Sequence, residues 1–84
     1  MKYRVVVEPG AERDIRRLAA DVRARVLRAA MALGDDPRPH GYRKLAGRGE
    51  QYRIRVGDYR VIYDIRDAVL VVLVIEVGHR SSIY

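Results

Sequence analysis

The sequence lacks cysteine, tryptophan and phenylalanine, and it contains only two lysines. The absence of cysteine excludes disulfides, thiol nucleophiles and thiolate metal sites. The chain does not open on a basic-then-apolar signal peptide, and its longest apolar run, residues 68–75, is too short to span a bilayer. We therefore expect a soluble, cytoplasmic protein with no part in a membrane.

The residues that are present indicate a small folded protein with excess positive charge. A length of 84 residues fits one domain, 1–84, and the 49% apolar content is typical of a globular chain. The formal net charge is +6, and 15 of the 17 basic residues are arginines. Arginine-rich codon usage is one explanation. The other is recognition of phosphate groups, which the planar guanidinium favours. Composition alone does not decide between them.

The first half of the chain predicts one strand and a helical hairpin. Residues 2–8 are rich in valine and predict the strand, and residues 11–20 predict the first helix. Asp21 is expected to cap a second helix that ends at Gly34. The arginines of both helices are interpreted as a solvated face. The apolar stripe of the second helix consists of Val22, Val26, Ala30 and Leu33.

The second half predicts a basic loop at residues 38–50 and then three strands. The dipeptide Gly57-Asp58 is typical of a two-residue hairpin turn. The fold class is therefore α+β in the order β-α-α-β-β-β, with a helical hairpin packed on a small, mainly antiparallel sheet. The three strands are expected at residues 51–56, 59–66 and 69–77.

The hairpin turn fixes the strand register and gathers arginines on one face of the sheet. Arg55 then lies opposite Arg60, and like charges in this arrangement destabilise a strand pair by about 0.2–1 kcal/mol. We interpret the cluster as a site for an anion, above all phosphate. The alternative is that Asp64 or Glu76 neutralises one of the arginines. The core face consists of Tyr52, Ile54, Val56, Tyr59, Val61, Tyr63 and Ile65. The arginine face consists of Arg53, Arg55, Arg60, Ile62 and Asp64.

The last residues extend this site in a way that depends on the turn before the final strand. A two-residue turn would place His79 on the arginine face, whereas a three-residue turn would place Glu76 and Arg80 there. Gly78 can also interrupt the alternation. Without a role in the site, His79 would be an ordinary surface residue and Tyr84 a frayed terminus.

These residues carry a resemblance to a known family. The segments K-L-A-G at 44–47, Y-R-I-R-V-G-D-Y-R-V-I-Y at 52–63, V-G-H-R at 77–80 and I-Y at 83–84 occur in an order and spacing similar to those of RelE toxins. These toxins of bacterial and archaeal toxin–antitoxin systems form part of the RelE/ParE superfamily. The resemblance covers essentially the whole chain. It implies a RelE-like fold and a ribosome-dependent endonuclease that cuts mRNA in the A site without a metal or other cofactor.

In the reaction that the resemblance implies, the 2′-hydroxyl of the mRNA attacks the adjacent phosphate. Arg60 and Arg80 match the arginines that clamp this phosphate. Arg53 and Arg55 match two basic positions that are lysines in the best-known enzymes. Because arginine stays protonated, these two are expected to stabilise charge rather than to accept a proton. Tyr84 matches a C-terminal tyrosine that stacks on or orients the base.

The resemblance leaves the general base open. His79 has a suitable ordinary pKa and is a candidate, since histidines near the C-terminus serve catalysis in several relatives. Weaker candidates for the base are Lys44, His40 and Glu76. The basic loop is expected to contact RNA or the ribosome through Arg43, Lys44 and Arg48.

The resemblance also implies partners, namely the ribosome, mRNA and a RelB-like antitoxin that is acidic and partly helical. Two alternatives are a ParE-like toxin that inhibits DNA gyrase and cleaves nothing, and an inactive basic RNA-binding homologue. The combination of Arg53, Arg55, Arg60, Arg80 and Tyr84 favours the nuclease, because a gyrase inhibitor has no need of it.

Overall fold

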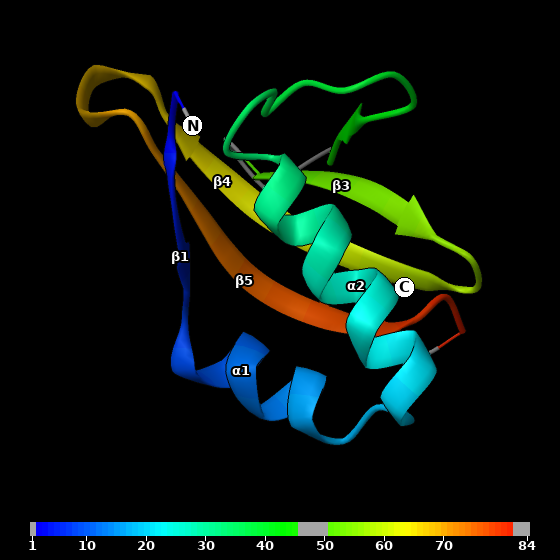
Figure 1. Ribbon diagram of the computed structural model, residues 1–84. Coiled ribbons are helices and arrows are strands. Elements are labelled where there is room, and N and C mark those ends of the chain that lie inside the picture. The colour runs from blue at the N-terminus through cyan, green and yellow to red at the C-terminus, as the bar shows by residue number, and fades with distance from the viewer. Residues whose placement is uncertain (1, 46–50, 82–84) are drawn as a thin grey trace.

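A computed structural model describes residues 2–45 and 51–81 of the chain. Its elements form a single five-stranded sheet in the order β1-β5-β4-β3-β2, with β1 parallel to β5 and the other neighbours antiparallel (Figure 1). The elements are β1 (Arg4–Val7), α1 (Pro9–Arg16), α2 (Ala20–Ala32), β2 (Arg43–Lys44), β3 (Gln51–Val56), β4 (Tyr59–Arg66), the 3-10 turn η1 (Asp67–Val69) and β5 (Val71–His79). The predicted α+β fold of a helical hairpin on a mainly antiparallel sheet is confirmed.

Both helices cover the same face of the sheet and bury the core against it. Ile15 of α1 and Val26 of α2 join one cluster with the inward residues of β3, β4 and β5. Removing these apolar side chains from water is the main drive for this packing. The predicted α2 stripe is confirmed, with Val26, Ala30 and Leu33 at most 1% exposed. The other face carries no described helix, and we call it the open face.

Several predicted boundaries differ from the structure. The helix α1 begins at Pro9, where proline fits the first helical position, and ends at Arg16 rather than residue 20. Ala19, not Asp21, is the N-cap of α2 and makes no side-chain cap bond. Asp21 lies in the first turn, where its negative charge favours the helix dipole. The predicted loop at 38–50 contains the short strand β2, which pairs with β3.

The connection between β4 and β5 is longer than predicted and is followed by a bulge. Arg66 pairs with Val71, so the loop holds four residues. Farther along, Ile62 lies opposite Glu76 but Tyr63 lies opposite Val74, which leaves Ile75 as an extra residue. A four-residue loop alone would keep the odd-numbered residues of β5 on the open face. The bulge reverses this alternation, so the even-numbered residues from Glu76 onward face that side.

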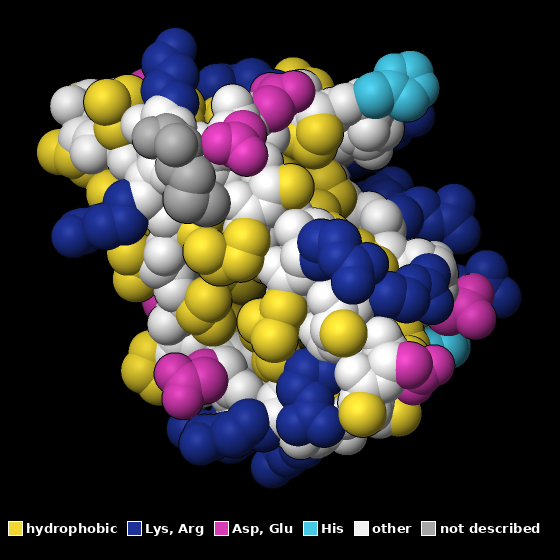
Figure 2. Space-filling model, viewed as in Figure 1, with side chains coloured by type: hydrophobic (Ala, Val, Ile, Leu, Met, Phe, Trp, Pro, Cys, Tyr) yellow, Lys and Arg dark blue, Asp and Glu magenta, His cyan; other side chains and the backbone are white. Residues whose placement is uncertain are grey.

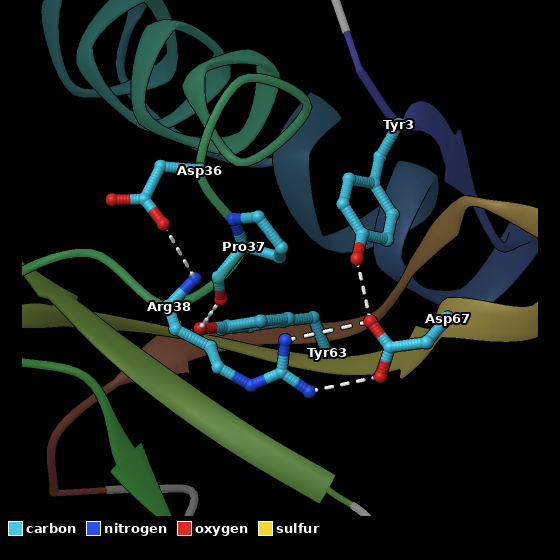
Figure 3. A network of polar contacts seen from close by, with 6 residues as sticks. All are labelled: Tyr3, Asp36, Pro37, Arg38, Tyr63 and Asp67. Carbon is cyan, nitrogen blue, oxygen red and sulfur yellow. Dashed lines mark hydrogen bonds and ion pairs between the residues drawn. The ribbon is translucent and has the colours of Figure 1, made fainter.

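A polar clasp joins three segments that are far apart in the sequence (Figure 3). The Tyr3 hydroxyl donates to Asp67 Oδ1 at 2.5 Å, and Arg38 Nη2 donates to Asp67 Oδ2 at 2.9 Å. Beside them, the buried Tyr63 hydroxyl donates to the Pro37 carbonyl at 2.8 Å. The hydrogen bonds from Arg38 and Tyr3 lower the pKa of Asp67, and burial raises the pKa of Tyr63. The clasp fixes the chain after α2 to the start of β1 and to the β4–β5 turn.

Replacing Asp67 by Asn should change how stability responds to acid. A carboxyl whose pKa is lowered by folding stabilises the protein above its ordinary value of 3.8, and this contribution is lost as the pH falls through the folded pKa. We therefore expect the wild-type Tm to fall more steeply than that of Asp67→Asn below about pH 4. Thermal melts from pH 2 to 7 measure this. The Asp58→Asn variant is the control, and parallel curves for wild type and Asp67→Asn would contradict the expectation.

Two glycine substitutions should have opposite effects. Gly57 has φ +61°, as the first position of a Gly-X hairpin turn requires, and an added Cβ would lie 3.0 Å from Arg25 Nη2. Gly57→Ala should cost about 1 kcal/mol, or about 4–8 °C in Tm. Gly10 lies in α1, and an added Cβ would come no closer than 3.9 Å to Ile75 O. Gly10→Ala should therefore leave the Tm unchanged or higher. Equal losses from both variants would refute this account of the turn.

Candidate active site on the open face

The open face places arginines side by side on adjacent strands. Arg55 pairs with Arg60, as predicted, and Arg60 lies opposite Gly78 on β5. In the next row, Arg53 lies between Arg43 and Ile62. Directly paired residues have Cα atoms about 4.5–5.5 Å apart. Four guanidinium groups therefore start from one small area of sheet, and we call Arg43, Arg53, Arg55 and Arg60 the arginine cluster.

The open face also has a small apolar layer of its own. Ile62 is 0% exposed and Leu45 is 8% exposed, and neither belongs to the core cluster beneath the helices. The sequence predicted the face on which Ile62 lies but not its complete burial. The arginine cluster is therefore attached to strands whose two sides both carry buried residues.

Of the two carboxylates expected to neutralise the arginine cluster, Asp64 binds an arginine outside it, and Glu76 has an interaction partner of its own. Asp64 accepts a hydrogen bond from Arg66 Nε at 2.7 Å, on its own strand and away from the Arg55–Arg60 pair. Arg53 and Arg60 have interaction partners of their own. Arg55 is exposed and has no carboxylate within 4.0 Å among residues 2–45 and 51–81. The positive potential is therefore least compensated around Arg55.

Arg80 lies at the end of β5, beside the tip of the β3–β4 hairpin. Its backbone N–H donates to the Asp58 carbonyl at 2.9 Å, and its Nε lies 4.0 Å from Asp58 Oδ1. Arg80 lies in the turn that follows β5, so its contacts with Asp58, and not strand alternation, place it beside the tip of the hairpin that carries Arg55 and Arg60. The sequence reasoning assigned Asp58 only to the turn and missed this contact. The sequence does show an acidic residue, Asp58, in the turn of the hairpin, and this residue could have been considered as a partner for an arginine at the end of the final strand.

Two predicted site residues lie on the helix-bearing side instead. His79 is opposite Tyr59, with the rings edge-to-face at 5.4 Å, and Ser81 N–H donates to His79 Nδ1 at 3.3 Å. Lys44 is opposite Tyr52, a core residue, so it points away from the open face. The structure therefore does not bring His79 or Lys44 to the arginine cluster. Tyr84 and Arg48 lie outside the described residues.

A pocket of about 460 Å³ lies between α2, the segment after it and β3. Ala29, Leu33 and Ile54 contribute apolar lining, and His40 and Arg55 line it as well. His40, one of the weaker candidates for the base, thus lines the same pocket as Arg55 of the arginine cluster. No group of three histidine or carboxylate side chains in the described part of the chain is arranged to hold a metal ion. None of the described helices is long and apolar enough to cross a membrane.

Known proteins share this sequence pattern and this architecture. Residues 5–84 match the family model described as the ParE toxin of the type II toxin–antitoxin system parDE. A search of the curated proteins finds no match. Among solved structures, the archaeal RelE–RelB complex from Pyrococcus horikoshii OT3 contains a chain with 30% identity and a TM-score of 0.84, covering 98% of this chain and 99% of that one.

Two further structures extend the similarity to bacterial proteins. The RelBE2 toxin–antitoxin complex from Mycobacterium tuberculosis gives 28% identity and a TM-score of 0.85, over 95% of this chain and 100% of that one. The isolated RelE toxin from E. coli gives 29% identity and a TM-score of 0.78, over 92% of this chain and 83% of that one. The match of the family model across nearly the whole sequence, supported by these structures, shows that the chain belongs to the RelE/ParE superfamily of type II toxin–antitoxin toxins.

Proposed function

We propose that this toxin is a metal-independent endoribonuclease of the RelE type, which binds in the ribosomal A site and cleaves mRNA there, so that translation stops. The observation that carries the proposal is the Arg55–Arg60 pair, which has Arg53 beside it on the open face and Arg80 at the tip of the same hairpin. Like charges held together in this way are best compensated by a polyanion. The similarity to RelE toxins along nearly the whole chain supports RNA as that polyanion.

The proposed chemistry is attack of a 2′-hydroxyl on the adjacent phosphate, with departure of the 5′-oxygen. Negative charge builds up on the phosphate oxygens in the transition state, where fixed cations stabilise it most. Arg60 and Arg80 are proposed to hold the phosphate, and Arg53 and Arg55 to stabilise the developing charge. Arginine remains protonated throughout, so these residues do not remove the proton of the 2′-hydroxyl.

Glu76 is better placed than Asp64 to accept this proton, because Asp64 lies farther from the Arg55–Arg60 pair and accepts a hydrogen bond from Arg66. Glu76 shares a row with Arg53 and Ile62 and lies two residues before Gly78, which faces Arg60. His79 points to the other side of the sheet, so it could accept this proton only after the backbone around it changed conformation. We propose Glu76 as the general base, with the ribosome orienting the mRNA for in-line attack.

The proposed partners are the ribosome, mRNA and a RelB-like antitoxin. The P. horikoshii and M. tuberculosis structures are complexes of toxin with antitoxin, and this toxin is expected to have an antitoxin of its own. The family-model match to ParE toxins favours a second candidate, a gyrase inhibitor that cleaves nothing. The two candidates make opposite predictions about RNA cleavage.

Primer extension on a defined mRNA in a purified translation system tests the proposal. We expect new 3′ ends at the A-site codon only when ribosomes are present. Arg60→Ala and Arg80→Ala should reduce cleavage at least 100-fold, since each removes a cation from the transition state. Arg13→Ala, on the exposed face of α1, is the matched control and should cleave like wild type. Absence of cleavage by wild type, together with inhibition of gyrase in a supercoiling assay, would show instead that the protein is a ParE-like gyrase inhibitor.

Substitution separates the two candidate bases. Glu76→Gln should lower the single-turnover cleavage rate, because an amide cannot accept the proton of the 2′-hydroxyl. His79→Gln should leave the rate unchanged, since His79 does not face the arginine cluster. The reverse pattern would assign the proton transfer to His79.

Arg55→Gln should stabilise the fold while weakening RNA binding. Removing one of two directly opposed cations should raise the free energy of unfolding by about 0.2–1 kcal/mol. It should also weaken the salt dependence of single-stranded RNA binding. The slope of log K against log salt concentration should become smaller in magnitude by about 0.7. Urea unfolding and fluorescence anisotropy measure the two effects, with Arg13→Gln as the control. A loss of stability in Arg55→Gln would show that the pair is already compensated within the protein.

A further inference from the structure

The edge of β5 that faces β1 changes neighbours partway along the strand. β1 pairs with β5 as far as Val74, and the N–H of Glu8, just beyond β1, donates to the Val74 carbonyl at 2.9 Å. The chain then turns into α1, which lies beside β5 beyond the end of β1 (Figure 1). The approach is close, since a Cβ added at Gly10 would lie 3.9 Å from the Ile75 carbonyl oxygen. The bulge therefore lies where a helix has replaced the neighbouring strand.

Asp14 of α1 supplies a hydrogen-bond acceptor on this edge, where β1 no longer provides one. Its Oδ2 accepts the backbone N–H of Val77 at 3.1 Å, and the contact is partly buried. An N–H left without an acceptor in such a place would cost free energy. This N–H belongs to the peptide group that joins Glu76 to Val77. Asp14 thus holds the backbone immediately after Glu76, in the segment where the bulge interrupts the ladder.

The surroundings of Asp14 are basic, yet its carboxylate is not used for an ion pair. Arg13, Arg16 and Arg17 are its neighbours in the sequence, and Figure 2 shows dark blue side chains at the lower edge of the molecule, where Figure 1 places α1. No cationic side chain in the described part of the chain lies within 4.0 Å of the Asp14 carboxylate. Glu12, on the same helix, lies 3.8 Å from Arg16. The contacts therefore assign Asp14 to the backbone of β5.

We propose that Asp14 is a positioning residue of the nuclease: by holding the Glu76–Val77 peptide group, it sets the direction of the Glu76 side chain beside the arginine cluster. This proposal rests on the proposed function, in which Glu76 is the general base. A bulge interrupts the regular ladder, so the backbone there is less constrained by strand pairing. Ile75 is the extra residue of this bulge, and Glu76 follows it directly. The bond from Val77 to Asp14 supplies a constraint that strand pairing does not.

A positioning role predicts a separation of binding from chemistry. The arginine cluster is carried by β2, β3 and β4, so binding of RNA does not depend on the peptide group that Asp14 holds. A general base, by contrast, must lie within hydrogen-bond reach of the proton that it removes. A displacement of about 1 Å can slow a reaction about 100-fold. Loss of the Asp14 bond should therefore lower the rate of cleavage and leave the affinity for the ribosome nearly unchanged.

Single-turnover cleavage on ribosomes, together with the Kd for the ribosome, tests the proposal. Asp14→Ala should lower the rate about tenfold and change the Kd by less than about threefold. Asp14→Asn keeps an oxygen that accepts the N–H of Val77, and it should cleave within about threefold of wild type. Both variants remove the same charge, so net charge does not explain a difference between them. Glu12→Ala, which removes an exposed carboxylate of the same helix, is the matched control and should cleave like wild type.

A double-mutant cycle separates positioning of Glu76 from a general effect on the fold. In the Glu76→Gln background, Asp14→Ala should lower the rate by less than about twofold, because no base remains to be positioned. An equal loss in both backgrounds would show a purely structural role and overturn the proposal. Hydrogen exchange of the Val77 amide in the free toxin measures the bond itself. It should be at least about tenfold faster in Asp14→Ala and close to the wild-type rate in Asp14→Asn.

Failure of this proposal differs from failure of the proposed function. If wild type cleaves mRNA and Asp14→Ala cleaves at the same rate, the positioning role is wrong and the nuclease remains. If Asp14→Ala and Asp14→Asn lose the same activity, the carboxylate acts through its charge, which also overturns the proposal. If wild type does not cleave, the proposed function is refuted and the positioning role with it. Circular dichroism of each variant establishes that a loss of rate is not a loss of fold.

Discussion

Pairing of β4 with β5 is the constraint on which the rest of the structure depends. These strands lie inside the sheet, where β1 pairs with β5 and β3 pairs with β4, and the two helices pack on the same face; only the short strand β2 is one step removed, since it pairs with β3. Their register brings Gly78 opposite Arg60 and Glu76 opposite Ile62. The bulge at Ile75 makes this possible, because it inserts one residue without disturbing Val72 and Val74 in the core. The bulge thus lets β5 direct its valines toward the helices on both sides of Ile75, while Glu76 and Gly78 face the open side.

The electrostatics of the open face follow from the choice of arginine. Lysines at 53 and 55 could change their protonation when partly buried, whereas arginines keep their charge. The face therefore has a permanent positive potential, which Asp64 does little to offset because Arg66 binds it. Such a face suits binding and charge stabilisation of a phosphate, and it leaves proton transfer to another group.

Local patterns in the sequence were enough to predict the register of the β3–β4 hairpin and the residues of these strands that form the core. The turn at Gly57-Asp58 set the register, and strict alternation then separated Tyr52 and Ile54 from Arg53 and Arg55. Features that depend on distant contacts could not be predicted in this way. The clasp joins Tyr3 to Asp67, 64 residues apart, and the bulge at Ile75 has no turn residue to mark it. The side on which His79 lies therefore could not be read from the sequence, and neither could the burial of Ile62.

The extra residue in β5 also bears on how such a site can change over generations. Deleting Ile75 would remove the bulge, and Glu76 would then follow Val74 in strict alternation, so Glu76 would stay on the open face and His79 on the helix-bearing side. The codon of this one residue can therefore be lost over generations without any exchange of side chains between the two faces. In this architecture, the length of β5 is a heritable variable at the bulge, and the chemistry of both surfaces is independent of it.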